Sequence, residues 1–173
     1  MKRTILRIIL LLLLAGTFFT IFQFSSQNGT DSGTLSRKVM NKIVNVFPYT
    51  KDLSNQTKYK IVERSQPIIR KGAHFSIYIL VGILIMTFIS TYRISLWKKL
   101  LCSSGIGFLY AVSDEIHQMY VPGRTARVLD VVIDTAGVWF GIGIVLIIIS
   151  VWKALTQVGK NANSKCENNL SNT

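Results

Sequence analysis

The sequence predicts an all-α fold: an integral membrane bundle of four transmembrane helices, with an amphipathic interfacial helix between helices one and two. Hydrophobic residues make up 49% of the chain, and its mean hydropathy is +0.38. Four apolar segments are long enough, or nearly so, to cross about 30 Å of hydrocarbon as helices. Lipid offers the backbone no hydrogen-bond partners, so helices are the default structure for such spans.

The four apolar segments lie at about residues 8–24, 73–92, 100–120 and 128–152. No small-x-small cleavage site follows the first segment cleanly, which favours a retained helix over a cleaved signal peptide. The third segment is the least apolar, because it carries Asp114 and Glu115 near its end. We therefore expect one transmembrane domain over residues 1–152. The tail, residues 153–173, is rich in Asn, Ser and Lys and is expected to be disordered.

The polar loop, residues 25–72, contains a second kind of pattern. Leu35, Val39, Ile43, Val46 and Phe47 recur at helical spacing, with basic residues on the other faces. This pattern is typical of an amphipathic helix that lies on a membrane surface and meets anionic headgroups. Later in the loop, Pro67 suits the first turn of the helix that leads into the second span.

The charge balance and the cysteines exclude two other classes of protein. The chain has 20 Lys and Arg against 8 Asp and Glu, a formal net charge of +12. Such a charge often indicates nucleic-acid binding, but the uninterrupted apolar stretches do not fit a soluble nucleic-acid-binding domain. Cys102 lies in an apolar run and Cys166 in the polar tail, which excludes a disulfide-stapled secreted fold.

The positive-inside rule favours an orientation with both termini in the cytoplasm. Two short basic clusters fall on one side by parity: Lys2, Arg3 and Arg7 before the first span, and Arg93, Lys98 and Lys99 after the second. The long loop on the other side also holds basic residues. It counts less, because long loops translocate largely regardless of charge.

Parity also places the unusual polar residues on one face of the membrane. They stand where the first and third spans end and where the second and fourth begin: Ser26, Gln27; Lys71, His74, Tyr78; Asp114, Glu115, His117, Gln118; Arg124, Asp130 and Asp134. Ionisable groups at membrane depth are costly unless they pair or face water, so they indicate a functional site. We predict a shared polar pocket. The alternative is that these residues only form interfacial anchors and ion pairs that hold the bundle together.

The acidic positions of the last span lead into a pair of glycines. Asp130 and Asp134 are one turn apart, and Gly137 and Gly141 follow on the same helix. Small residues let a neighbouring helix approach closely, so another helix is expected beside the two aspartates.

Two kinds of chemistry are considered for the residues of the pocket: metal binding and acid/base catalysis. Its carboxylates and histidines suit a divalent cation, but no H-E-x-x-H or equivalent spacing is present and basic residues compete for the carboxylates. We therefore predict no metal and no other cofactor. For catalysis, His117 with Asp114 or Glu115 is the candidate acid/base unit, and Arg124 would stabilise an anion. Whether the chain is an enzyme stays open.

Five blocks in one order carry a resemblance to a known family: Phe24-Ser-Ser-Gln27, Lys71-x-x-His74-Phe75, Asp114-Glu115-x-His117-Gln118, Pro122-Gly123-Arg124 and Asp130-x-x-x-Asp134-x-x-Gly137-x-x-x-Gly141. Over about residues 1–150 the chain resembles the VanZ-like family, named for teicoplanin resistance in Gram-positive bacteria. The family usually has Asn at the position of Asp134, so this chain adds a negative charge there.

The resemblance implies a multi-pass membrane protein associated with resistance to glycopeptides, especially lipoglycopeptides. On the first hypothesis, an outward-facing pocket engages a lipid-linked ligand, either a cell-wall precursor or the drug. The candidate ligand-binding residues are Ser26, Gln27, Lys71, His74, Tyr78, Gln118, Arg124, Asp130 and Asp134. The alternatives are a membrane-embedded hydrolase or transferase acting on a lipid-linked envelope precursor, and an accessory protein. Membrane lipids are expected partners and nucleic acid is not; a homo-oligomer stays open.

Overall fold

The computed structural model describes residues 2–46, 48–51 and 53–171, without the side chains of residues 29–33, 35–36, 51 and 160–171. These residues form six helices and no strand, which confirms the all-α prediction. The helices are α1 (Lys2–Ser25), α2 (Gly29–Val46), α3 (Pro48–Lys51), α4 (Asn55–Ser90), α5 (Leu96–Gln118) and α6 (Val128–Ser171).

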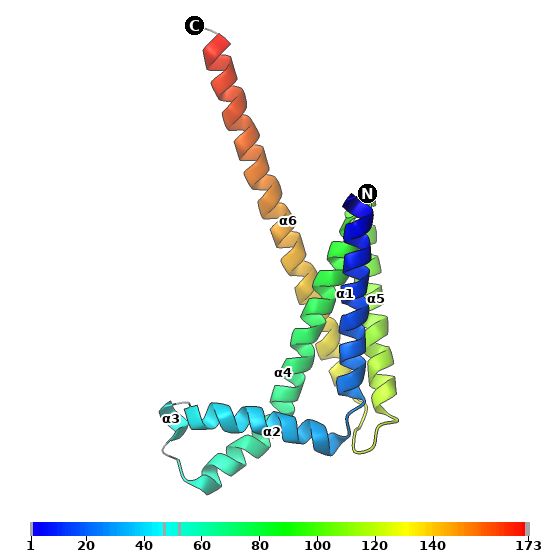
Figure 1. Ribbon diagram of the computed structural model, residues 1–173, viewed down its shortest axis with the longest axis vertical. Helices are drawn as coiled ribbons and strands as arrows, with labels where there is room; N and C mark the ends of the chain where they lie inside the picture. The colour runs from blue at the N-terminus through cyan, green and yellow to red at the C-terminus, as the bar shows by residue number, and fades with distance from the viewer. Residues whose placement is uncertain (1, 47, 52, 172–173) are drawn as a thin grey trace.

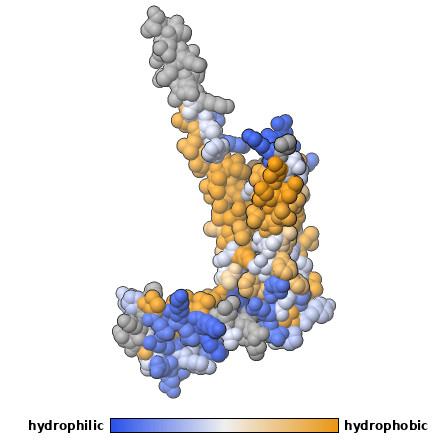
Figure 2. Space-filling model, viewed as in Figure 1, coloured by the Kyte–Doolittle hydropathy of each residue, from blue (hydrophilic) through white to orange (hydrophobic). Residues whose placement is uncertain are grey.

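The four long helices α1, α4, α5 and α6 form the bundle, with α4 in contact with the other three (Figure 1). Its core includes Ile21 of α1, Tyr78 and Ile85 of α4, Ala111 of α5 and Val138 of α6. The outside of the bundle is apolar, and Figure 2 shows it as a hydrophobic band between two hydrophilic ends. A surface of this kind is suited to lipid, since a soluble protein rarely exposes so large an apolar patch.

Three helices of the described chain are long and apolar enough to cross a membrane: Lys2–Ser25, Asn55–Ser90 and Val128–Gly159. Helix α5 packs against α1, α4 and α6, but lysines near its start and two carboxylates near its end lower its hydropathy. The structure thus supports a membrane protein with several spans. The fourth span stays a prediction.

Glycines set the distance between α4 and α6. A Cβ at Gly137 would lie 2.7 Å from the carbonyl oxygen of Phe75, and one at Gly141 would overlap the carbonyl oxygen of Ile79. Gly82 of α4 makes the reciprocal approach to the backbone of Val138. The predicted close approach beside the aspartates is therefore present, and the neighbouring helix is α4 of the same chain.

Helix α4 begins well before the point that the sequence predicted. Ser54 caps its N-terminus by accepting a hydrogen bond from the amide of Thr57 at 3.3 Å, so a stable start exists at Asn55. Pro67 lies inside the helix, and the prediction that it stands in the first turn is wrong. Proline can bend a helix without ending it, and in Figure 1 α4 changes direction between its first turns beside α2 and its long part in the bundle.

Helix α2 lies across the end of the bundle in Figure 1 and is held to α4 by an ion pair between Arg37 and Glu63 at 2.7 Å. Among the described side chains of α2, Val44 is buried. Val39, Ile43 and Val46 of the predicted apolar stripe are exposed. The Leu35 side chain and Phe47 lie outside the described residues. That this helix lies on a membrane surface stays a prediction.

Helix α6 continues without a break from Val128 to Ser171, so it extends past the apolar span into the polar tail. The expected disorder of the tail stays a prediction. No proline follows Pro122, and residues such as Lys153, Ala154 and Leu155 have high helix propensity, so the helix can continue beyond the apolar span.

Both chain ends point away from the same end of the bundle, as parity predicted (Figure 1). At that end, Arg7 donates hydrogen bonds to the side chain and backbone of Thr91 at 2.9 and 3.0 Å and stacks on Tyr92. The predicted site lies at the opposite end of the bundle. The orientation of the two ends in the membrane stays a prediction.

Candidate functional site

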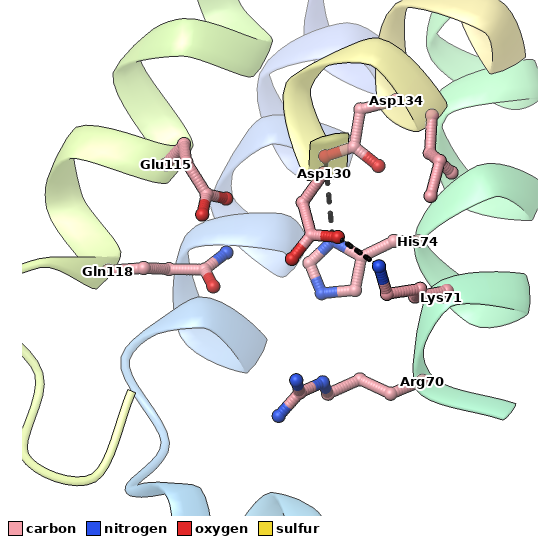
Figure 3. A pocket seen from close by; sticks show the side chains of 8 residues that line it. Arg70, Lys71, His74, Glu115, Gln118, Asp130 and Asp134 are labelled. Atoms are coloured by element: carbon pink, nitrogen blue, oxygen red, sulfur yellow. Dashed lines mark ion pairs between the residues drawn. The ribbon is translucent and has the colours of Figure 1, made fainter. Parts of the chain in front are cut away.

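A polar pocket lies where the end of α5, the start of α6 and the middle of α4 meet (Figure 3). It has a volume of about 20 Å³ and is lined by Arg70, Lys71, His74, Glu115, Gln118, Asp130, Ile133 and Asp134. These residues come from three helices, α4, α5 and α6. The convergence that parity predicted is therefore present at this end of the bundle.

Two charged contacts join α4 to α6 across the pocket. The Nζ atom of Lys71 lies 2.7 Å from Oδ1 of Asp130, and Nδ1 of His74 lies 3.7 Å from Oδ2 of Asp134 (Figure 3). Each helix supplies its two residues from consecutive turns, so both contacts lie on one face of the interface. Among the described residues, Asp130 forms its ion pair with Lys71 and not with an arginine.

Gln118 connects the pocket to α1. Its side-chain amide donates hydrogen bonds to Oδ2 of Asp114 at 3.1 Å and to Oγ of Ser25 at 3.3 Å. Its carbonyl oxygen accepts a hydrogen bond from Arg124 at 3.2 Å. All four groups are thereby held in one network, in which Ser25, Asp114 and Gln118 are buried.

Arg124 caps the C-terminal end of α1. Its Nη2 donates to the carbonyl oxygen of Phe24 at 2.8 Å, and its Nε donates to that of Gln27 at 3.0 Å. A cation is favourable at this end of a helix, where carbonyl groups lack partners. The preceding turn requires Gly123, whose φ of 74° is in the left-handed region.

Burial lowers the pKa of Arg124 from its ordinary value, and the neighbouring Arg70 lowers it further. Asp114 and Glu115 act in the opposite direction. An arginine stays protonated under these conditions, so the lowered pKa reflects an unfavourable local potential for a cation.

His117 and Glu115 have other partners than the sequence suggested. His117 faces α1, with Nε2 3.0 Å from Oγ of Ser26 and its ring stacked on Phe22 at 4.5 Å between centroids. Glu115 lines the pocket and accepts a hydrogen bond from the backbone amide of Arg127. In the described chain no hydrogen bond joins His117 to Asp114 or Glu115. The three proposed acid/base residues therefore lie on different faces of α5.

Deeper in the bundle, three possible metal ligands converge. One ligand atom from each of His74, Asp114 and Asp134 lies within 4.8 Å of the other two. Tyr78 stands one turn beyond His74 on α4 and is fully buried. Its hydroxyl group has no hydrogen-bond partner among the described residues.

A second, larger pocket adjoins the polar one and is mostly apolar. It has a volume of about 230 Å³ between α1, α2 and α4, and its walls are Ile21, Phe24, Gln27, Val39, Ile69, Arg70, Ala73, His74, Ile77 and Arg124. Arg70 and His74 line both pockets. The predicted residues Gln27 and Arg124 thus lie in the apolar pocket.

Sequence reasoning left two residues out of the candidate site. Arg70 lines both pockets, and Ser25 accepts the hydrogen bond from Gln118. Each is the immediate neighbour of a residue that was included, Lys71 and Ser26. The signal was therefore in the sequence, but the rotation of each helix decides which of two neighbours faces inward.

Comparison with known proteins places this arrangement in a family. Residues 8–149 match the VanZ/LLP1 family. No curated protein and no solved structure matches the chain. The matched region includes every candidate site residue and most of the four bundle helices. The chain therefore belongs to the VanZ/LLP1 family.

Proposed function

We propose that this VanZ/LLP1-family protein holds a lipid-linked ligand with an anionic headgroup at the outer face of the cell membrane. By doing so it lowers susceptibility to teicoplanin-type lipoglycopeptides. One observation carries the proposal: two arginines that have no carboxylate partner among the described residues stand in the wall of an apolar pocket that opens beside a polar one.

The two arginines supply the anion site. Arg70 and Arg124 both line the apolar pocket, and Arg70 disfavours the charge on Arg124. Neither forms an ion pair with a carboxylate in the described part of the chain. Two neighbouring cations repel each other, and a phosphate or carboxylate between them would relieve this repulsion and accept charge-assisted hydrogen bonds.

The remaining walls suit an acyl or prenyl chain. Ile21 and Phe24 of α1 face Ile69, Ala73 and Ile77 of α4 across a space of about 230 Å³. Ligand pockets for small molecules are mostly apolar and have volumes from about 300 Å³ upward, so this space would take part of an apolar chain. A ligand that combines an apolar chain with an anionic group would fill the pocket and meet the arginines.

The polar pocket has a volume of about 20 Å³, room for about one water molecule, so the rest of the headgroup would meet polar side chains at its mouth. Glu115, Gln118 and Asp130 offer oxygen acceptors and an amide beside Arg70. Such groups hydrogen-bond sugar hydroxyls and peptide amides, which lipid-linked cell-wall precursors and lipoglycopeptides both present. A precursor or drug molecule bound here cannot take part in binding between drug and precursor. A drug that carries its own acyl chain is affected more strongly than one without, because its chain fits the apolar pocket.

The first test is drug susceptibility in a sensitive Gram-positive host at matched membrane levels. Wild type is expected to protect against teicoplanin more than against vancomycin, compared with empty vector. Arg70→Gln removes a pocket cation and is expected to lose most of this protection. Arg64→Gln removes an exposed arginine of the same helix and is the matched control.

Two results would contradict the proposal. If wild type protects against neither drug, the protein has no role in resistance. If Arg70→Gln and Arg64→Gln protect equally, the pocket takes no part in the protection.

A second candidate function is a membrane-embedded hydrolase or transferase acting on a lipid-linked envelope precursor. It is favoured by the contact of His74 with Asp134 inside the pocket, since a carboxylate-oriented imidazole is a common general base. The two functions differ in the product. Lipid extracts from cells with wild type would contain a modified precursor that His74→Gln lacks if the protein is an enzyme, and would be identical if it only binds.

A further inference from the structure

We propose that His74, Asp114 and Asp134 bind a divalent transition-metal ion, of the class of Zn²⁺ or Mn²⁺, at the centre of the bundle. The site would join α4, α5 and α6 at one point. This inference goes beyond the proposed function, since the anion site at Arg70 and Arg124 needs no metal.

The geometry is close to that of a three-ligand site. One atom from each of the three side chains lies within 4.8 Å of the others. Ligands in a tetrahedral zinc site are about 3.4 Å apart, since each is about 2.1 Å from the metal. The atoms would therefore have to approach by at most about 1.4 Å, which small rotations of the side chains can supply.

The charge balance also calls for a cation. Asp114 and Asp134 are 4% and 2% exposed, and buried carboxylates need a compensating charge or a metal. Lys71 pairs with Asp130, and Arg124 donates to carbonyl oxygens of α1 and to Gln118. Arg70 lines the polar pocket together with Asp134 but forms no ion pair in the described part of the chain. Among the described residues, Asp114 receives one neutral amide from Gln118, and Asp134 contacts the imidazole of His74 at 3.7 Å. A divalent ion would neutralise both carboxylates with His74 uncharged.

An independent feature points to something bound beside the cluster. Tyr78 is fully buried, and its hydroxyl has no hydrogen-bond partner among the described residues. It lies one turn from His74, packs beside Gly137 of α6, and is within electrostatic reach of Asp114 and Asp134. A buried hydroxyl left unpaired costs about 1–3 kcal/mol, so it is expected to have a partner. A water or hydroxide completing the coordination of a metal would supply that partner.

The ligand types select the metal class. One imidazole and two carboxylates suit Zn²⁺, Mn²⁺ or Fe²⁺, whereas Ca²⁺ and Mg²⁺ prefer sites built from oxygen alone. The sequence offered the ligand types but could not indicate this set, because its three ligands come one from each of three helices. No local ligand spacing of the zinc-protease kind exists to be found.

The test is metal binding by the full-length protein in detergent. The protein is stripped with a chelator, incubated with Zn²⁺ or with Mn²⁺, separated from free ion by size exclusion and analysed by mass spectrometry for metal content. Wild type is expected to hold about one ion per chain. The Asp134→Asn and His74→Gln variants are expected to retain at least tenfold less metal per chain than wild type. Asp130→Asn should match wild type, since its carboxylate pairs with Lys71 outside the cluster.

Tyr78→Phe provides a finer test, because it removes only the hydroxyl. It is expected to keep the stoichiometry and to weaken metal affinity severalfold. Co²⁺ absorption of the unmodified protein keeps the proposal testable even if a ligand variant fails to fold, since a low-symmetry nitrogen and oxygen site gives intense visible bands. Wild type without bound ion and without those bands would overturn the proposal. So would folded Asp134→Asn protein with the metal content of wild type.

Discussion

Gly141→Val is expected to unfold the bundle or to lower its melting temperature more than any other single change considered. A side chain at this position would overlap the carbonyl oxygen of Ile79 and lie within 2.9 Å of the amide nitrogen of Ile83. Both are backbone atoms of α4, so no side chain can rotate away to make room. Overpacking of this kind costs about 1–3 kcal/mol or more, and here it acts on the central helix pair.

Gly143→Val is the matched control, since nothing lies within 4 Å of a Cβ placed there. The two variants make the same chemical change in the same helix, two residues apart. Melting of the detergent-purified proteins, followed by circular dichroism or by a thiol-independent dye, gives the comparison. Equal melting temperatures for the two variants would contradict the close contact between α4 and α6.

Arg124→Gln is expected to show the second large effect, on function with a smaller effect on stability. The guanidinium joins two carbonyl oxygens at the end of α1 to the side chain of Gln118, and it also lines the apolar pocket. A hydrogen bond to a charged group is worth about 1.5–3 kcal/mol. Loss of the cation is therefore expected to weaken binding of an anionic ligand by roughly 10- to 150-fold.

In cells, this change is expected to return teicoplanin susceptibility to the level of the empty vector. Arg127→Gln is the control, because Arg127 meets the site only through its backbone amide, which donates to Glu115. Arg124→Lys separates charge from shape. A lysine keeps the charge but cannot make the three forked hydrogen bonds, so partial protection is expected. Full protection by Arg124→Gln would exclude this residue from ligand binding.

The gathering of the site at one end of the bundle could be predicted from the sequence. The positions of the apolar segments predict where the chain reverses direction. The number of crossings between them then places Lys71, Gln118 and Asp130 on the same face of the membrane. The role of Gly137 and Gly141 was also predictable, because a run of small residues beside buried carboxylates indicates close helix packing. The family followed from the spaced polar blocks, which stand where the predicted spans begin or end.

What could not be predicted depends on how each helix is rotated about its axis. His117 and Gln118 are neighbours in the sequence, yet His117 faces Ser26 of α1 while Gln118 enters the pocket. The grouping of His74 with Asp114 and Asp134 depends on the rotation of three helices at once. The position of Pro67 was mispredicted for a different reason. The helix that contains it begins at a cap, Ser54, that lies far from the apolar span.

The central claim is that the apolar pocket holds a lipid-linked anionic ligand, and photo-crosslinking tests it most directly. A benzophenone amino acid replaces Ile77, which lines the pocket, or Leu80, which is 44% exposed on the same helix. After irradiation in native membranes, the lipids attached to each are identified by mass spectrometry. We expect the Ile77 position to be enriched in lipids with phosphate-linked headgroups relative to Leu80, and Arg124→Gln to abolish this enrichment. The same bulk lipid composition at both positions would contradict the account.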